Sequence, residues 1–357
     1  MSLSVMHVVI AKTWGGGEQY VYDVCEEMKH QGINPYVVVD KRNKFLQQKY
    51  QKVATVLVTN LYTAAGLFGV ADIVNFIRTY KLEVVNCHSG HALLACILAK
   101  KFTDAKLVMF KHNALPAKND LYHKWQRKVV DAFICVSKLV YNLQTKNLMP
   151  NEINKFHLVY NGINTKRFQK YPNKNFRSNN KYIIGYAGRL AADKGIDLLI
   201  KAFSDVALIH KQVYLYIAGP DEKEDYTKQL KELVHNLHLQ DRILFLGQVE
   251  DMEKFYKTID LFVLPSKVSE SFGLVLCEAI YCGVPVITTN SGAQQEIVTD
   301  NKYGWIITPN NQVELYKAID YAITQKKVLA NGKKYIKNTF SVFNCVNQLT
   351  KVYYSIR

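Results

Sequence analysis

The chain has 357 residues, of which 48% are hydrophobic and 21% are charged, and its length is typical of two domains. This apolar fraction excludes an intrinsically disordered chain, and 18 glycines with 8 prolines are too few for a collagenous or low-complexity one. A formal net charge of +16 points to a nucleic acid, an anionic membrane surface or a phosphorylated ligand. The charge is not a tail, because residues 1–165 hold 20 basic and 11 acidic side chains and residues 166–357 hold 26 and 19.

Short β-branched segments alternate with amphipathic helical stretches along the chain, which is typical of parallel sheets with helices on both faces. The first series of predicted strands comprises 6–11, 34–39, 53–58, 84–87, 106–110, 132–136 and 155–159. The second comprises 182–186, 213–218, 243–246, 261–264, 284–288 and 304–307. The polar, aperiodic stretch 166–181 between them is typical of a solvated linker. We therefore expect an α/β chain with two Rossmann-like, doubly wound domains that face each other across a cleft.

Two features of the first half lie just beyond predicted strands. Gly15, Gly16 and Gly17 lead into a helix, where a ligand could approach the backbone and an anion could meet unpaired N–H groups, although a plain turn has the same composition. His88 and His112 follow the fourth and fifth strands. They can bind a sugar or phosphate, or they can be surface or capping histidines. A metal role is disfavoured, because no carboxylate lies at ligand spacing near them.

In the second half, Gly188 and Arg189 end a strand and Lys194 precedes the next helix. A forked guanidinium and a mobile ammonium near one helix N-terminus suit a diphosphate, although a solvated turn is the alternative.

The strongest pattern follows the predicted strand 261–264. Glu270 lies in the loop, residues 272–274 offer backbone N–H groups at a helix start, and Glu278 lies within the apolar helix. The two acids could contact different ends of one extended ligand. A buried carboxylate without a partner is costly, so Glu278 should have a hydrogen-bond donor; the alternative role is a capping or salt-bridged residue.

In this order the motifs resemble those of the family-4 retaining glycosyltransferases, the group 1 glycosyl transferases of GT-B fold. The resemblance covers nearly the whole chain. The matching segments are Gly-Gly-x-Glu at 15–18, Val-Ser at 136–137, Asn-Gly-Ile-Asn at 161–164, Gly-Arg-Leu at 188–190, Lys-Gly at 194–195, the glutamates at 270 and 278, Gly-Val-Pro-Val at 283–286 and Glu-Ile-Val at 296–298.

The resemblance implies a hexosyltransferase that takes its sugar from a nucleotide diphosphate sugar. A UDP-sugar is favoured because it is common among such enzymes, with a GDP- or ADP-sugar as alternative. The acceptor is a cell-envelope glycan, as in lipopolysaccharide or capsule synthesis, or a lipid-linked glycan; a soluble small molecule is the alternative. The assigned residues are Arg189, Lys194, Glu270 and His88 for catalysis, Gly16, Gly188, Phe272, Gly273, Leu274 and Glu278 for the donor, and Glu18 and His112 for sugar or acceptor contacts.

The chemistry of the implied reaction agrees with these residues. Negative charge builds on the departing diphosphate, and fixed cations stabilise it. Because Arg189 and Lys194 can supply them and the chain has no Asp-x-Asp, we expect a metal-independent reaction without a cofactor. The acceptor is expected to attack on the face that the diphosphate leaves; whether Glu270 acts covalently stays open.

The same resemblance sets the expected domains. Residues 1–165 form an acceptor-binding domain and residues 166–340 a nucleotide-sugar-binding domain, and residues 341–357 form a helix that packs back towards the first.

A membrane hypothesis rests on segment 118–129, in which a helix would align Leu121, Trp125 and Val129 on one stripe. The basic residues that flank the stripe are Lys124, Arg127 and Lys128. The alternative is a core-facing helix with a solvated basic face.

The seven cysteines lack C-x-x-C spacing, which predicts neither a zinc site nor disulfides but reduced core thiols. No signal peptide and no apolar run of about 18 residues is recognisable. We therefore expect a cytoplasmic protein, peripheral on the inner face of the cell membrane if segment 118–129 binds lipid.

Other functions fit less well. An epimerase or a phosphorylase would keep the two domains but not the paired cations and glutamates, and a dehydrogenase lacks its G-x-G-x-x-G motif after the first strand. A nucleic-acid-binding protein would concentrate its positive charge in one stripe, whereas here it is spread over both halves, so no nucleic acid is expected as a partner.

Overall fold

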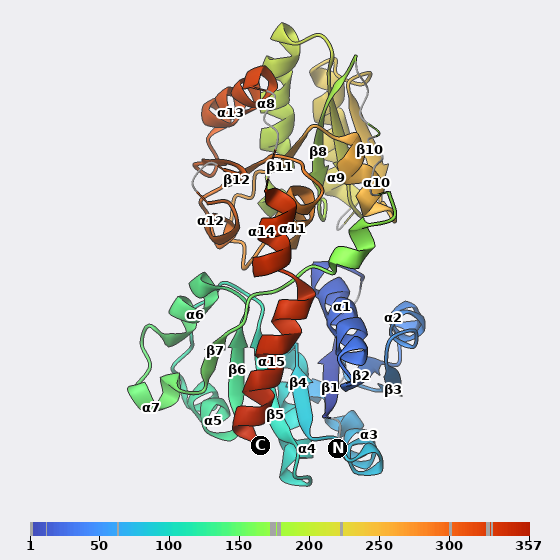
Figure 1. Ribbon diagram of the computed structural model, residues 1–357, viewed down its shortest axis with the longest axis vertical. Helices are drawn as coiled ribbons and strands as arrows, with labels where there is room; N and C mark the ends of the chain where they lie inside the picture. Colours follow the sequence, from blue (N-terminus) through green and yellow to red (C-terminus); the bar gives the residue numbers. More distant parts are fainter. Residues whose placement is uncertain are drawn as a thin grey trace. The chain divides into compact units, whose positions relative to one another are not determined.

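The structure is a computed structural model that describes residues 3–357 except 12, 63, 172–175, 177–179, 222–223, 300–301, 326–328 and 330. The chain forms two compact units (Figure 1). Unit 1 comprises residues 1–164 and 342–357, and unit 2 comprises residues 165–341.

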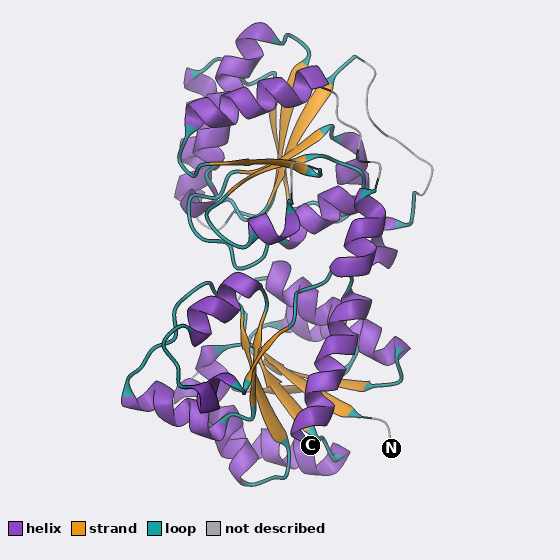
Figure 2. Ribbon diagram, turned by 60° about the vertical axis from the view of Figure 1, so that its left-hand side comes forward, coloured by secondary structure: helices purple, strands orange, loops and turns teal. Residues whose placement is uncertain are grey.

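Unit 1 is built on a parallel sheet of seven strands in the order β3-β2-β1-β4-β5-β6-β7, with helices on both faces (Figure 2). Because both faces are covered, the strands are nearly continuous apolar runs. The strands are β1 (Ser4–Val9), β2 (Asn34–Asp40), β3 (Thr55–Thr59), β4 (Val84–Cys87), β5 (Lys106–Lys111), β6 (Ala132–Cys135) and β7 (Phe156–Leu158). The helices are α1 (Gly16–His30), α2 (Lys44–Tyr50), α3 (Val70–Tyr80), α4 (Leu93–Lys101), α5 (Leu121–Val129), α6 (Lys138–Thr145), α7 (Pro150–Ile153) and α15 (Val342–Ile356).

Unit 2 repeats this architecture with six parallel strands in the order β10-β9-β8-β11-β12-β13. Its strands are β8 (Tyr182–Ala187), β9 (Val213–Ala218), β10 (Ile243–Gly247), β11 (Leu261–Leu264), β12 (Val286–Thr289) and β13 (Gly304–Ile307). Its helices are α8 (Ile196–Ile209), α9 (Glu224–Asn236), α10 (Met252–Thr258), α11 (Leu274–Tyr281), α12 (Gln294–Ile297), α13 (Gln312–Gln325) and α14 (Gly332–Thr339). The prediction of two Rossmann-like domains is confirmed.

Every predicted strand overlaps an observed one, and the differences at the ends have local causes. β3 starts at Thr55 rather than at residue 53, because the amides of Val53 and Ala54 bond to the carbonyl of Tyr50 and finish the turn after α2. β12 starts two residues late, because the amide of Val284 bonds back to the carbonyl of Ala279 at the end of α11.

The last helix, α15, belongs to unit 1 through buried polar contacts as well as apolar packing. The Asn86 amide on β4 donates to the Tyr353 hydroxyl at 2.7 Å. The Tyr20 hydroxyl on α1 lies 3.3 Å from Sγ of Cys345. Since buried polar groups are costly when unpaired, these contacts favour one seating of α15 over others.

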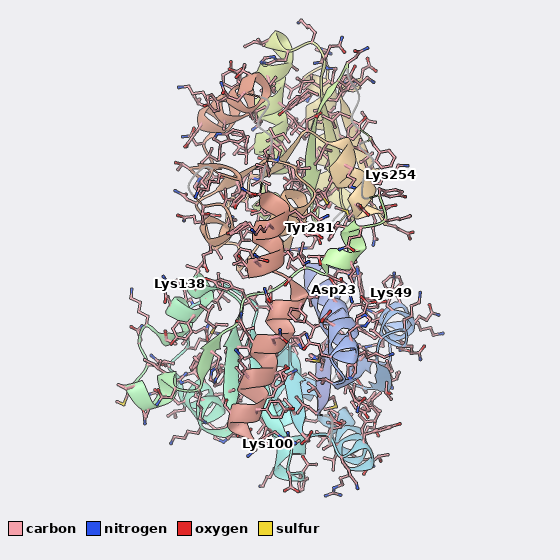
Figure 3. All side chains as sticks on the ribbon, viewed as in Figure 1. Asp23, Lys49, Lys100, Lys138, Lys254 and Tyr281 are labelled. Carbon is pink, nitrogen blue, oxygen red and sulfur yellow. The ribbon has the colours of Figure 1, made fainter. Side chains whose placement is uncertain are left out.

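The expectation of a solvated linker over 166–181 is wrong for its first part. Phe168 is 3% exposed and its ring packs on Tyr256 and on Tyr281, which Figure 3 labels. The amides of residues 170 and 171 donate to the buried carboxylate of Glu253. This part is therefore anchored to unit 2, and residues 172–175 and 177–179 lie outside the described ones.

The expected core thiols are confirmed. All seven cysteines lie in the described part of the chain and are free, and all but Cys282 are buried. Burial raises the pKa of the Cys135 and Cys345 thiols to about 12, which makes them poor nucleophiles.

Candidate functional site

The predicted cation and the predicted acid of unit 2 are joined at the carboxyl ends of β8 and β11. Nζ of Lys194 lies 2.7 Å from Oε1 of Glu270, and both side chains are about five-sixths buried. The hydroxyl of Ser266 donates to the same oxygen at 2.5 Å. Hydrogen bonds between charged partners are strong. A ligand that binds Lys194 or Glu270 must therefore replace the bond between them with bonds of its own.

Two glycines allow the loops around this ion pair to pack closely. Gly195 has φ +70°, and a Cβ there would lie 2.2 Å from the carbonyl oxygen of Pro265. At Gly292, a Cβ would lie 2.3 Å from the carbonyl oxygen of Glu270. A side chain at Gly195 would push the loop of Lys194 away from Pro265, and one at Gly292 would push the loop after β12 away from Glu270.

The remaining predicted donor residues of unit 2 follow the same strand ends. Gly188 and the exposed Arg189 come directly after β8. Gly273, with φ +110°, precedes α11, which begins at Leu274. The Phe272 side chain is buried against Phe340, so only the backbone of this residue is left to contact a ligand.

Glu278 is 8% exposed on α11, and the donor expected for it is Tyr256, whose hydroxyl donates to Oε2 at 2.9 Å. Arg167 lies 3.7 Å from Oε1. Burial raises the pKa of the Glu278 carboxyl, and Arg167 and Tyr256 oppose this rise. The sequence reasoning missed both partners: Tyr256 carries no motif, and Arg167 lies in the stretch interpreted as linker.

In unit 1, Gly16 is the first residue of α1, and Glu18 shapes the turn before it. A carboxylate oxygen of Glu18 accepts a hydrogen bond from the amide of Gly15 at 2.9 Å, as in a capping box. The glycine turn is therefore locked by its own helix, with the N-terminus of α1 behind it.

His88 and His112 are in contact, and a third histidine that the sequence reasoning missed joins them. Nδ1 of His88 lies 2.9 Å from Nε2 of His112, and Nε2 of His88 lies 2.9 Å from Nδ1 of His7 on β1. His7 is wholly buried. Burial lowers the pKa of His7 to about 3, that of His112 to about 4, and that of His88 well below its usual value. The available signal was a lone histidine in the apolar strand SVMHVV.

Helix α5 presents part of its apolar stripe outward. Leu121 is 86% exposed and Trp125 40% exposed. Lys124 and Lys128 are exposed as well, but Arg127 is not part of a solvated basic face as expected. It is 7% exposed, and its Nε donates to Glu152 at 2.7 Å. The alternative of a core-facing apolar stripe is therefore wrong for Leu121 and Trp125. Among the described residues, no helix has the length and hydropathy to cross a bilayer.

Comparisons with known proteins show which family and fold the chain shares. The chain matches the model of the Glycosyltransferase Family 4 over residues 14–167 and that of the Glycosyl transferases group 1 over residues 167–339. An uncharacterized glycosyltransferase of Methanocaldococcus jannaschii is 31% identical over 56% of this chain, and the match spans 54% of that relative's length. The lipopolysaccharide 1,2-N-acetylglucosaminetransferase of Salmonella typhimurium is 27% identical over 76% of this chain and 71% of its own.

Solved structures share the fold over nearly the whole chain. A glycosyltransferase from Rickettsia africae has a TM-score of 0.86 and 24% identity, with 99% of this chain and 98% of that one covered. HepE of Anabaena, in complex with UDP and glucose, has a TM-score of 0.82 and 21% identity, with 99% and 100% covered.

Proposed function

The chain belongs to the family-4 glycosyltransferases of GT-B fold, and from this premise we propose that it is a retaining, metal-independent hexosyltransferase. Its donor is a nucleotide diphosphate sugar, with UDP-sugar favoured, and its acceptor is a cell-envelope or lipid-linked glycan. The observation that carries the proposal is the pairing of Lys194 with Glu270 at the strand ends of unit 2. Support for the acceptor comes from relatives named for lipopolysaccharide and capsule synthesis, and for UDP from the HepE complex.

Donor binding exchanges one ion pair for two contacts. The ammonium of Lys194 turns from Glu270 to the diphosphate, and the Glu270 carboxylate accepts hydrogen bonds from the sugar hydroxyls instead. Lys194 and Arg189 then stabilise the negative charge that grows on the diphosphate as the anomeric C–O bond breaks. The closely packed glycine loops hold the backbones of Lys194 and Glu270, so only the side chains have to move when the donor binds.

Glu278 fits the ribose of the nucleotide. The Tyr256 hydroxyl and Arg167 fix its carboxylate in a nearly dry position. A carboxylate accepts hydrogen bonds from two neighbouring hydroxyls. We assign the diphosphate, donor sugar and ribose to unit 2, with its Gly188 and backbone 272–274, and the acceptor to unit 1, with Glu18 and the histidines. Gly16 keeps the donor-binding role that the resemblance implies.

The test of this function is nucleotide binding to the purified protein. We expect UDP or a UDP-sugar to raise the melting temperature and to bind in calorimetry, since a ligand of the folded state stabilises it by mass action. The Glu278→Ala variant should bind about 10 to 100 times more weakly, because a group that bonds to substrate hydroxyls is lost. The exposed α9 variant Glu232→Ala is the control. Stabilisation by GDP- or ADP-sugars alone would contradict the uridine assignment, and no response to any nucleotide sugar would contradict the function.

We further propose that α5 brings the enzyme to an anionic membrane surface, where a lipid-linked acceptor would lie. Tyr122 is 46% exposed beside Leu121 and Trp125, and Met149, next to α7, is 69% exposed. Exposed aromatic and aliphatic side chains among lysines are typical of an interfacial surface.

Vesicle binding tests this surface. Replacing Lys124 and Lys128 by glutamate is expected to weaken binding to phosphatidylglycerol vesicles about 30-fold, since each lysine near such a surface contributes about 1 kcal/mol. Arg127 is left intact because its ion pair with Glu152 holds α5 in place. The control replaces Lys228 and Lys231 on α9, which alters the net charge equally. Equal losses in both variants would show general charge attraction and would remove α5 as the docking surface.

A further inference from the structure

The three histidines of unit 1 form one continuous chain of imidazole rings. His7 and Asn86 are register partners on β1 and β4, and His88 follows β4. The ring of His88 stacks on those of His7 and His112, each at 5.2 Å between centroids, and on Phe110 at 4.3 Å. Both nitrogens of His88 lie 2.9 Å from a histidine nitrogen. His88 therefore has no ring nitrogen left for a ligand.

A count of the N–H protons leaves the three imidazole rings only two possible sets of tautomers. All three imidazoles are neutral, since burial lowers the pKa of each. Three neutral rings carry three N–H protons, and each of the two contacts between rings needs one of them. The third proton must lie at one end of the chain, either on Nε2 of His7 or on Nδ1 of His112.

The inner end is the less favourable place for that proton. Nε2 of His7 is buried and has no hydrogen-bond partner among the described residues. An N–H group there would be left unpaired in a dry core, which native structures rarely tolerate. The Asn86 amide does not decide the matter. Its nitrogen lies 3.5 Å from Nδ1 of His7 and donates to Tyr353 at 2.7 Å, but its Oδ1 is buried without a partner among the described residues, and a half-turn of the amide would put that acceptor at Nδ1 of His7 instead. The arrangement that avoids a buried orphan N–H has all three rings protonated on Nδ1.

We propose that His7 is a positioning residue whose Nδ1–H fixes the orientation and tautomer of His88, and that His88 in turn makes Nδ1–H of His112 a hydrogen-bond donor to a ligand oxygen. The resemblance gives both His88 and His112 a role at the ligand, whereas here His112 alone makes the contact and His88 only orients it. That the oxygen belongs to a sugar hydroxyl or phosphate rests on the proposed function, whereas the proton positions do not.

The three hydrogen-bonded histidines are unsuited to transferring a proton during the reaction. If His112 gave up its Nδ1 proton and the chain shifted, a replacement would have to enter at Nε2 of His7, which is buried and unpartnered. In this relay of hydrogen bonds from His7 through His88 to His112, the first two histidines orient His112. His112 binds the ligand as a neutral hydrogen-bond donor and not as a general acid.

Nitrogen-15 NMR of the imidazole rings tests the proton positions in the full chain without any ligand. Long-range proton–nitrogen correlation distinguishes the two tautomers, and single histidine replacements assign the signals. We expect the Nδ1–H tautomer for His7, His88 and His112. The Nε2–H tautomer at His88 and His112 would overturn the proposal.

Variants of His7 test the positioning role. His7→Phe keeps a ring but removes the donor, and we expect mixed tautomers at His88 and His112 and a loss of kcat/KM of about tenfold. His7→Asn places an amide N–H near the position of Nδ1 and should restore both. His157→Phe on β7 is the matched control for loss of a partly buried histidine.

The outcomes separate this inference from the proposed function. Unchanged His88 and His112 tautomers in folded His7→Phe would overturn the relay. If His7→Phe does not fold, His7→Asn and the spectrum of the unaltered chain still decide it. If the tautomers are as expected but no nucleotide sugar is used, the relay stands and the function fails.

Discussion

Replacement of Lys194 by alanine is expected to lower kcat/KM about 10² to 10³-fold while the protein stays folded. Lys194 is the cation that the structure holds at the strand ends of unit 2, 2.7 Å from Glu270, and the leaving diphosphate gains negative charge in the transition state. Loss of one preorganised group that stabilises such charge costs about this factor in other enzymes. Because the contact strengthens in the transition state, kcat should fall along with kcat/KM.

Steady-state transfer with a radiolabelled donor measures this effect, and thermal unfolding checks the fold. The matched control is Lys201→Ala, an exposed lysine on α8, which should leave transfer within about twofold of the unaltered enzyme. Near-normal turnover of Lys194→Ala would place the diphosphate elsewhere, with Arg189 as the next residue to replace.

Much of the fold follows from local patterns in the sequence. Most strands are short apolar runs, the longer helices have a 3.6-residue period, and right-handed crossovers restrict the strand orders that a doubly wound sheet can take. The ends of strands are harder, because they depend on what the neighbouring turn does with its amides. At the start of β12, for example, the carbonyl of Ala279 on α11 takes the amide of Val284.

Positions at strand ends can be predicted, but contacts between distant residues cannot. The apolar helix around Glu278 shows that a buried carboxylate needs a donor, yet nothing in sequence marks Tyr256 as that donor, since it lies 22 residues away on another helix. His7 is similar: one histidine in an apolar strand gives no hint that His88, 81 residues on, lies against it. Pairing of this kind is set by sheet register, which brings β1 beside β4.

A periodic pattern also does not predict which face of a helix is buried. Helix α5 has a clear apolar stripe, but Arg127 and Gln126 are buried while Leu121 and Trp125 are exposed. Arg127 compensates its burial with Glu152 and with the carbonyl of Lys118, which is bonded at 2.8 Å. A buried charge with such partners is tolerable. Because Arg127 takes the buried position, Leu121 and Trp125 stay exposed and can contact another partner.

The ion pair at the centre of the site makes a second prediction, in which binding and turnover move in opposite directions. In Glu270→Gln the side chain keeps its shape and can still accept from Ser266, but the negative charge that holds Lys194 is gone. The free lysine should bind a diphosphate more readily, so we expect UDP affinity to rise about three- to tenfold.

Transfer by Glu270→Gln should nevertheless fall about 10²-fold, because an amide neither accepts two sugar hydroxyls as a carboxylate does nor stabilises the positive charge that develops on the sugar ring. Calorimetry with UDP and steady-state transfer measure the two effects, and Glu232→Gln on α9 is the control for loss of an exposed carboxylate. A parallel fall of affinity and turnover would mean that Glu270 acts only by holding Lys194 in place. In the double variant with Lys194→Ala, the gain in UDP affinity should vanish, because it comes from the released lysine alone.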